Sequence, residues 1–152
     1  MAKLNWAMVC QRALIDQSNN LSIVQVLEEL GIPAPPPDKP VALGAIIPIA
    51  LTVVSSWQRV DSDKAEKTRG RIRMIAPTGK IFGRAEFDID LSVARRCRHL
   101  AEMGGMPYYG AGLYVIRFDL AVAKKWRNVG DTDFTLHHNM NIKVAPVSKA
   151  KH

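Results

Sequence analysis

The sequence has few of the features that mark secreted, metal-binding or membrane proteins. Its two cysteines, Cys10 and Cys97, are too few for a secreted disulfide framework and too far apart for a zinc clip or redox pair. Within residues 1–16 the only unbroken apolar run covers residues 6–10, which is shorter than a signal peptide requires. We therefore expect buried thiols in a reducing compartment and a cytoplasmic location.

The sequence does contain enough apolar material for one folded domain. Hydrophobic residues make up 47% of the 152 residues and charged residues 23%, which is typical of a globular protein and too apolar for disorder. A chain of this length buries about two thirds of the surface that it exposes when unfolded. We predict a single domain over residues 1–147, followed by a basic C-terminal tail over residues 148–152.

The longest stretch without charge, residues 40–58, has 19 residues, which is close to the length of a membrane-spanning helix. However, Pro48 interrupts it, β-branched residues are frequent in it, and its last third is polar. A buried strand over residues 41–54, apolar on both faces and with Pro48 at a bulge or an unpaired edge position, is therefore predicted instead of a membrane helix. Accordingly, no membrane partner is expected.

Residues 67–91 alternate with a period of two, which is typical of a β-hairpin. The turn is predicted at residues 76–79, where proline suits the first central position and glycine supplies a positive φ. A loop closed at Ala76 and Ile81 brings charges of opposite sign together and keeps apolar residues on the other face. The resulting pairs are Lys67 with Asp90, Arg69 with Asp88, Arg71 with Glu86, Gly70 with Phe87 and Ile72 with Ala85. This register places Arg71 and Glu86 on the solvent face, and Ile72 and Phe87 in the core.

The remaining segments also favour strands. Residues 3–15 and 21–30 form a hairpin around a turn of Asp, Asn and Ser, and a proline-rich connector follows at residues 33–40. A second pair is predicted from the alternating apolar residues at 114–126 and 134–144, with a turn at 128–131. Between the hairpins, residues 92–112 fit either a short helix capped by Ser92 or a strand over residues 95–103. The predicted fold class is an all-β, antiparallel β-sandwich of seven or eight strands.

Three short motifs spread over the chain carry a family resemblance. They are Leu-Ser-Ile-Val at residues 21–24, Pro-Thr-Gly-Lys at residues 77–80 and Gly-x-Pro-x-x-x-x-Gly-x-Tyr at residues 105–114. Together they resemble a family of small uncharacterised bacterial β-sandwich proteins, a domain of unknown function. The resemblance implies an immunoglobulin-like or similar topology, with a strand over residues 95–103 and a loop over residues 105–112. It implies no catalytic residue, and the apolar segment around Pro48 and the arginine cluster described below depart from it.

The first functional hypothesis is a non-catalytic binding or scaffolding module. Sandwiches present loops and edge strands to protein partners, and Met and Tyr are enriched at interfaces. The glycine-rich loop at residues 103–113 therefore provides the partner-binding candidates Met106, Pro107, Tyr108 and Tyr109. In the alternative interpretation, these side chains pack back onto the end of the sandwich. The predicted partner is a protein, including a second copy of the chain as a homo-oligomer.

The second hypothesis is nucleic-acid binding. The net charge of +7 favours polyanions, and Arg95, Arg96 and Arg98 form a local cluster of anion-binding candidates. Nearby tyrosines could stack on bases. The basic row at residues 67–73 is largely neutralised by acidic residues in the predicted hairpin, so we rank this hypothesis second.

The third hypothesis is an enzyme with an unrecognised site. Imidazole and carboxylate groups make metal sites and acid–base pairs, and the candidates are His99, His137, His138, Asp131 and Asp133. Adjacent residues on a strand point to opposite faces, so His137 and His138 cannot ligate one metal without a bulge. His138 lies on the apolar face, where a hydrogen-bonded core histidine is expected. We predict no catalytic residue, no metal and no cofactor.

Overall fold

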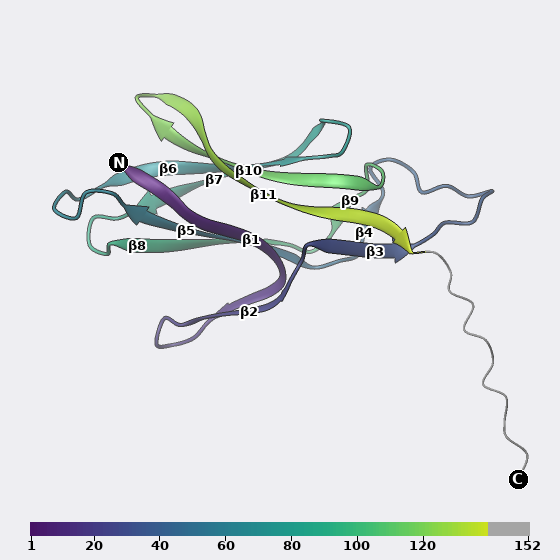
Figure 1. The fold of residues 1–152 in the computed structure, drawn as a ribbon, viewed down its shortest axis with the longest axis horizontal. Coiled ribbons are helices and arrows are strands. Elements are labelled where there is room, and N and C mark those ends of the chain that lie inside the picture. The colour runs from purple at the N-terminus through teal and green to yellow at the C-terminus, as the bar shows by residue number, and fades with distance from the viewer. Residues whose placement is uncertain (140–152) are drawn as a thin grey trace, which may run out of the picture.

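The computed structural model describes residues 1–139, which form eleven β-strands in three sheets. The first sheet, sheet A, has the order β2 (Leu21–Val26), β1 (Ala2–Ile15), β5 (Leu51–Arg59) and β8 (Arg96–Met103). The second, sheet B, has the order β3 (Glu29–Pro33), β11 (Lys125–Asn139), β10 (Gly112–Val122), β6 (Lys67–Ile75) and β7 (Ile81–Asp90). A small sheet pairs β4 (Ile46–Ile47) with β9 (Met106–Pro107). Sheets A and B lie on top of each other as two layers (Figure 1).

The predicted all-β sandwich is confirmed, with two corrections. The eleven strands exceed the predicted seven or eight because two predicted strands are each divided and because β9 forms within residues 105–112, which were expected to be a loop. The run at residues 21–30 ends as β2 and starts again as β3, which pairs with β11 in parallel and not antiparallel. Pro48 separates β4 from β5, so the strand predicted at residues 41–54 starts at Leu51. The immunoglobulin-like topology stays a prediction.

The core lies between the inner faces of the two sheets. Trp57 of β5 is fully buried and meets Phe118 of β10 edge-on, with 6.4 Å between ring centroids. Tyr114 stacks on Phe134 at 5.3 Å. The first seven residues of β5 are all buried, so the predicted burial on both faces is correct for residues 51–54. It is wrong for residues 41–50, which are exposed or half-buried. Within residues 1–139, no helix has the length and apolarity to cross a membrane.

The register of β6 and β7 is confirmed over most of its length. All five predicted cross-strand pairs are present, and Ile72 is buried. Close to the turn, the prediction is wrong: a register shift after Met74 places Ile75, and not Ala76, opposite Ile81. The shift leaves Ala76 to close the turn through its N–H, which donates to the carbonyl of Lys80 at 2.8 Å.

The remaining uncertain segments are also settled. Residues 96–103 form β8, so the strand and not the helix is correct. The turn between β10 and β11 consists of Ala123 and Lys124, both with positive φ, and not of residues 128–131, which lie within β11. The apolar positions predicted at 140–144 and the tail at 148–152 lie outside the described residues.

Candidate functional site

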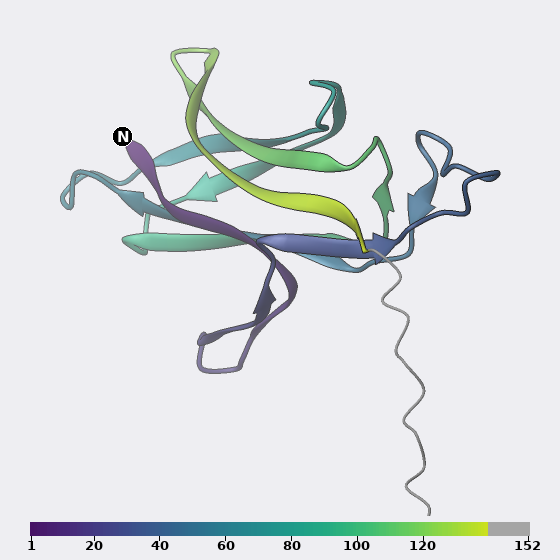
Figure 2. The same cartoon turned by 45° about the vertical axis from the view of Figure 1, so that its right-hand side comes forward.

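The hairpin formed by the second part of β1 and by β2 bends away from the rest of sheet A, and it creates a groove on the outer face of that sheet. The first part of β1 pairs with β5 as far as Cys10, and from Cys10 onwards β1 pairs with β2. The hairpin therefore extends below the layer that contains β5 and β8, as a separate arm (Figures 1 and 2). Consequently, the arm covers part of the outer face of sheet A.

A second, smaller apolar cluster holds the arm against the sheet. Cys10 and Ala13 of β1 and Val54 of β5 are almost completely buried. The partly buried side chains around them come from β1, β2 and β8: Trp6, Met8, Leu21, Ile23 and Leu100. Burial of these groups stabilises the position of the arm by the hydrophobic effect. It also raises the pKa of the Cys10 thiol, because burial disfavours the thiolate.

The tip of the arm is a turn organised by Asp16. Its carboxylate accepts hydrogen bonds from the backbone N–H groups of Ser18 and Asn20, each at 2.8 Å, and from the side-chain amide of Asn20. The hydrogen bonds from Asn20 are the main reason that the pKa of Asp16 is lowered. Asn19 adopts the left-handed conformation with φ of 60°, which asparagine tolerates. This geometry presents Asn19 to β8.

A β-bulge in β1 determines which side chains face the groove. Leu4 pairs with Trp57 and Trp6 with Ser56, so Asn5 is the extra residue. Before the bulge the inward residues are even-numbered, and after it Ala7 and Val9 belong to the main core. The bulge thus turns Trp6 to the outer face, where it belongs to the second cluster.

The outer face carries two successive cross-strand rows at this end of sheet A. Trp6, Ser56 and Arg98 form one row across β1, β5 and β8. The next row consists of Lys3, Gln58 and Arg96 on the same three strands. In both rows the member on β8 is an arginine, and neither row contains an acidic residue. Further along the strands, Met8, Val54 and Leu100 form an apolar row beneath the arm.

We call the space between these rows and the tip of the arm the hairpin groove. It is an open cavity of about 550 Å³. The side chains that matter for its chemistry are Asn5, Trp6, Asn19, Ser56, Arg96 and Arg98. Volumes of this size are typical of small-ligand sites. None of the lining residues is acidic, so the two arginines give the groove a positive potential.

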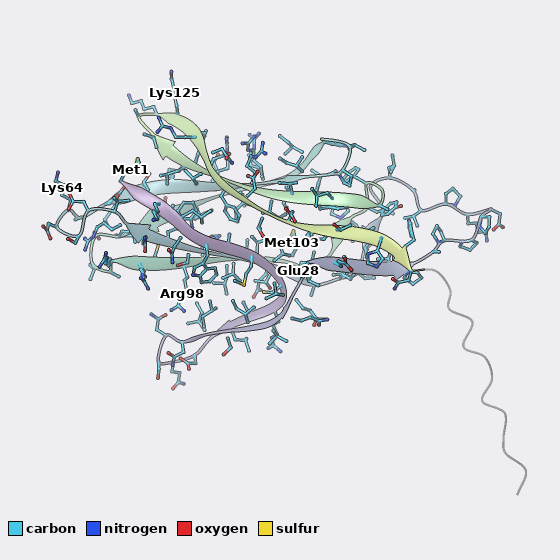
Figure 3. All side chains as sticks on the ribbon, in the orientation of Figure 1. Met1, Glu28, Lys64, Arg98, Met103 and Lys125 are labelled. Atoms are coloured by element: carbon cyan, nitrogen blue, oxygen red, sulfur yellow. The ribbon has the colours of Figure 1, made fainter. Side chains whose placement is uncertain are left out.

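The two arginines of the groove have different surroundings. The Nη2 group of Arg98 donates to the backbone carbonyl of Asn19 at 2.5 Å and to its Oδ1 at 2.9 Å, and Figure 3 marks Arg98 on the side of sheet A that faces the arm. A guanidinium has five N–H donors, so Arg98 keeps donors for a ligand. Arg96 is exposed. Arg95 precedes β8 and does not line the groove; its carbonyl accepts from the N–H of Arg59 at 3.0 Å. Of the three arginines predicted as a cluster, Arg96 and Arg98 line the groove and Arg95 does not.

The loop that carries the partner-binding candidates packs inwards. Met106 is fully buried and Tyr108 is 8% exposed, while Pro107 and Tyr109 are half-buried. The hydroxyl of Tyr114 holds this loop by donating to the carbonyl of Gly110 and accepting from the N–H of Tyr109, both at 2.9 Å. This arrangement corresponds to the alternative in which these side chains pack onto the sandwich.

The candidates for an enzyme do not form one site. His99 stacks on Phe87 inside the sandwich at 3.8 Å, and Asp131 pairs with Arg117 at 2.9 Å. His138 shares a hydrogen bond of 2.9 Å with the hydroxyl of Tyr108, which is the environment expected of a core histidine. His137 and Asp133 are also on β11 and take part in none of these contacts. Within residues 1–139, no three His, Cys, Asp or Glu side chains are grouped so as to hold a metal ion.

The basic row of β6 is neutralised more strongly than predicted. Arg71 and Arg73 both bind the buried carboxylate of Asp119 on β10, at 2.7 to 2.8 Å. Arg71 also lies over the ring of Trp126, 4.5 Å from its centroid. Lys67 pairs with Asp90 at 2.9 Å, and Arg69 pairs with Glu86. The basic row of β6 is therefore paired with carboxylates of the chain itself, in contrast to the arginines of the hairpin groove.

Sequence reasoning missed most of the groove. It found Arg96 and Arg98, but it left out Asn5, Trp6 and Ser56, which the bulge and the pairing of β1 with β5 bring beside them. A search of protein-family models finds no match to the chain, and a search of curated proteins finds none either. The family resemblance therefore stays a prediction.

Proposed function

We propose that this protein is a non-catalytic binding module that takes an anionic ligand in the hairpin groove. The observation that carries the proposal is the row of Trp6, Ser56 and Arg98, extended by Arg96 in the next row, with no acidic residue in the lining. Guanidinium groups bind phosphate and carboxylate through parallel N–H donors. The groove therefore offers an anion both positive charge and the parallel N–H donors of two guanidinium groups.

The contrast between the two outer faces supports this proposal. On sheet B the arginines of β6 are bound by carboxylates of the chain itself. The carboxylate at the tip of the arm, Asp16, is engaged by the backbone and side chain of its own turn, and it attracts Arg98 electrostatically without forming a salt bridge with it. Within residues 1–139 neither Arg96 nor Arg98 forms a salt bridge with a carboxylate, so an external anion can neutralise this pair.

The binding loop proposed from the sequence does not support this function, because Met106 and Tyr108 face the core. A protein partner, including a second copy of the chain, remains the second candidate, and one observation favours it. Four apolar side chains of the arm are 45 to 51% exposed, namely Leu14, Ile15, Val24 and Val26. If they form a dimer interface, Val24→Lys will reduce the mass measured by light scattering to that of a monomer.

Two further expectations belong to this proposal. Both cysteines are free, which supports a reducing compartment such as the cytoplasm. The histidine and aspartate candidates lie in separate environments, which supports a role without catalysis.

Calorimetric titration with pyrophosphate and with citrate tests the anion site. The informative variant is Arg96→Gln with Arg98→Gln, and the matched control is Arg84→Gln with Arg127→Gln, which removes two exposed arginines of sheet B. Hydrogen bonds to charged groups contribute about 1.5–3 kcal/mol each, so the groove variant should lose at least about tenfold in affinity. The control should bind as the wild type does. Equal losses in both variants, or no binding of either anion to the wild type, would contradict the proposal.

A further inference from the structure

The geometry points to a nucleotide unit as the ligand of the hairpin groove, with its base against Trp6 and its phosphate at Arg96 and Arg98. This inference rests on the proposed anion site and names its ligand class. A nucleotide unit can come from a free nucleotide or from a single-stranded nucleic acid, and both have the same chemistry at this site.

The spacing within the row fits such a ligand. Trp6 on β1 and Arg98 on β8 are separated by the one intervening strand, β5. Neighbouring strands lie about 4.8 Å apart, so the two backbones are about 10 Å apart. The long arginine side chain shortens the gap between indole and guanidinium. A base and the phosphate of the same nucleotide can therefore reach both groups across Ser56.

Trp6 is placed to act as a stacking surface. Trp6 packs against the small apolar cluster around Cys10 and Val54, and it also lines the groove. Packing in the cluster restrains the ring before a ligand arrives, which reduces the entropic cost of binding. Stacking of bases on aromatic side chains is tolerant of sequence because every base has a π-face.

The other lining residues suit a base and its sugar. The side-chain amides of Asn5 and Asn19 each carry donors and an acceptor, the combination that base edges present. The hydroxyl of Ser56 lies in the row between the aromatic and the basic residue. A carboxylate-rich peptide would use the arginines but would have no flat group for the indole, so the lining favours a nucleotide.

The aromatic residues first considered for stacking are excluded by their surroundings. Tyr108 is bound to His138 and almost completely buried. Tyr109 packs against Phe82, with ring centroids 5.6 Å apart, and has Lys80 over its ring. Among the described tryptophans, Trp57 is fully buried and Trp126 is covered by Arg71 on sheet B. Trp6 alone of these lines the groove.

The test uses two probes, adenosine monophosphate and a labelled ten-nucleotide single-stranded RNA, with pyrophosphate as the reference anion. Affinity for the RNA is measured by fluorescence polarisation and affinity for the others by calorimetry. The variants are Trp6→Leu and Arg96→Gln, and the matched controls are Trp126→Leu and Arg84→Gln, which lie on sheet B. Because Trp6 also packs in a cluster, each variant must first show the melting temperature of the wild type within a few degrees.

A second readout does not depend on replacing Trp6. In Trp126→Phe the remaining tryptophans are Trp6 and Trp57, and Trp57 is shielded from solvent. We expect nucleotide binding to quench the emission of this variant, and the quenching to saturate at the dissociation constant measured by calorimetry. Pyrophosphate should bind without comparable quenching.

The expected result is that Trp6→Leu weakens nucleotide binding at least about fivefold more than it weakens pyrophosphate binding. Arg96→Gln should weaken all three probes, and the controls none. Binding of adenosine monophosphate alone would identify a free nucleotide as the source, and tighter, salt-dependent binding of the RNA would identify a strand. Pyrophosphate binding without nucleotide binding, or nucleotide binding that depends on Arg96 and not on Trp6, would overturn this inference and leave the anion site intact. If no probe binds, both proposals are wrong.

Discussion

Arg98 on β8 donates hydrogen bonds to the backbone carbonyl and the side-chain Oδ1 of Asn19, at 2.5 and 2.9 Å, although 79 residues separate them in the chain. This contact joins the tip of the arm to the edge strand of sheet A. It therefore sets the width of the hairpin groove at the position where the arginines line it.

The first prediction concerns this contact. Arg98→Ala should speed hydrogen exchange of the backbone N–H groups at residues 16–20, because the tip loses its attachment to β8. Global stability should change by less than about 1 kcal/mol, since the contact is exposed to solvent. Hydrogen exchange measured by NMR checks the local effect, and Arg96→Ala serves as the control because Arg96 makes neither of these contacts. Unchanged exchange at the tip would show that the apolar cluster alone holds the arm.

The second prediction concerns the buried carboxylate on the other sheet. Asp119 is 1% exposed and binds Arg71 and Arg73. Asp119→Ala leaves two partly buried guanidinium groups without their partner, and we expect a loss of about 2–4 kcal/mol in the free energy of unfolding. The more exposed Asp131→Ala should cost less than about 1 kcal/mol. Urea denaturation compares the two, and equal losses would contradict the assigned role of Asp119.

The same carboxylate should make the protein sensitive to acid. Burial raises the pKa of Asp119, but the hydrogen bonds from Arg73 and Arg71 outweigh burial, and the pKa lies below 3.8. The stabilisation is therefore present above about pH 3.8 and is lost as the pH falls through the lower, folded value. In acid titrations of stability, Asp119→Ala should show a shallower loss below that pH than the wild type. Parallel curves would speak against this linkage.

The third prediction concerns His99 between the sheets. Its ring stacks on Phe87, its Nδ1 is buried without a hydrogen-bond partner, and burial lowers its pKa below the ordinary 6.5. The unfolded chain therefore takes up the proton first, so stability is complete above about pH 6.5 and falls as the pH drops towards the folded pKa. His99→Phe keeps the stack and removes the proton site. Its free energy of unfolding should fall less than that of the wild type between about pH 7 and pH 5, and an equal fall would refute the prediction.

The parts of the fold that sequence reasoning predicted well depend on local patterns. Charged residues recur at every second position of β6 and β7, and basic residues of β6 lie opposite acidic residues of β7. The register of Lys67 with Asp90 therefore follows from a period of two and a short turn. Gly70 opposite Phe87 has a structural reason, because a Cβ on Gly70 would lie 2.5 Å from the phenyl ring.

The parts that it missed depend on contacts between segments far apart in the chain. The sequence places Arg71 opposite Glu86, but only the position of β10 beside β6 reveals Asp119 as its ion-pair partner. The turn at Ala123 and Lys124 has no glycine, asparagine or proline to announce it, although both residues adopt positive φ. Trp6 was missed as a groove residue because a single extra residue, Asn5, reverses which side of β1 faces outwards.

The most direct test of the anion site is to map where the anion binds. In two-dimensional NMR spectra with pyrophosphate added, we expect shifts of the indole Nε1–H of Trp6, the Nε–H groups of Arg96 and Arg98, and the side-chain amides of Asn5 and Asn19. The indole signal of Trp126 and the Nε–H signals of Arg71 and Arg73, which Asp119 engages, should stay in place. Shifts confined to the groove would confirm the anion site. Shifts at Trp126 and Arg71 without any at Trp6 or Arg96 would contradict it.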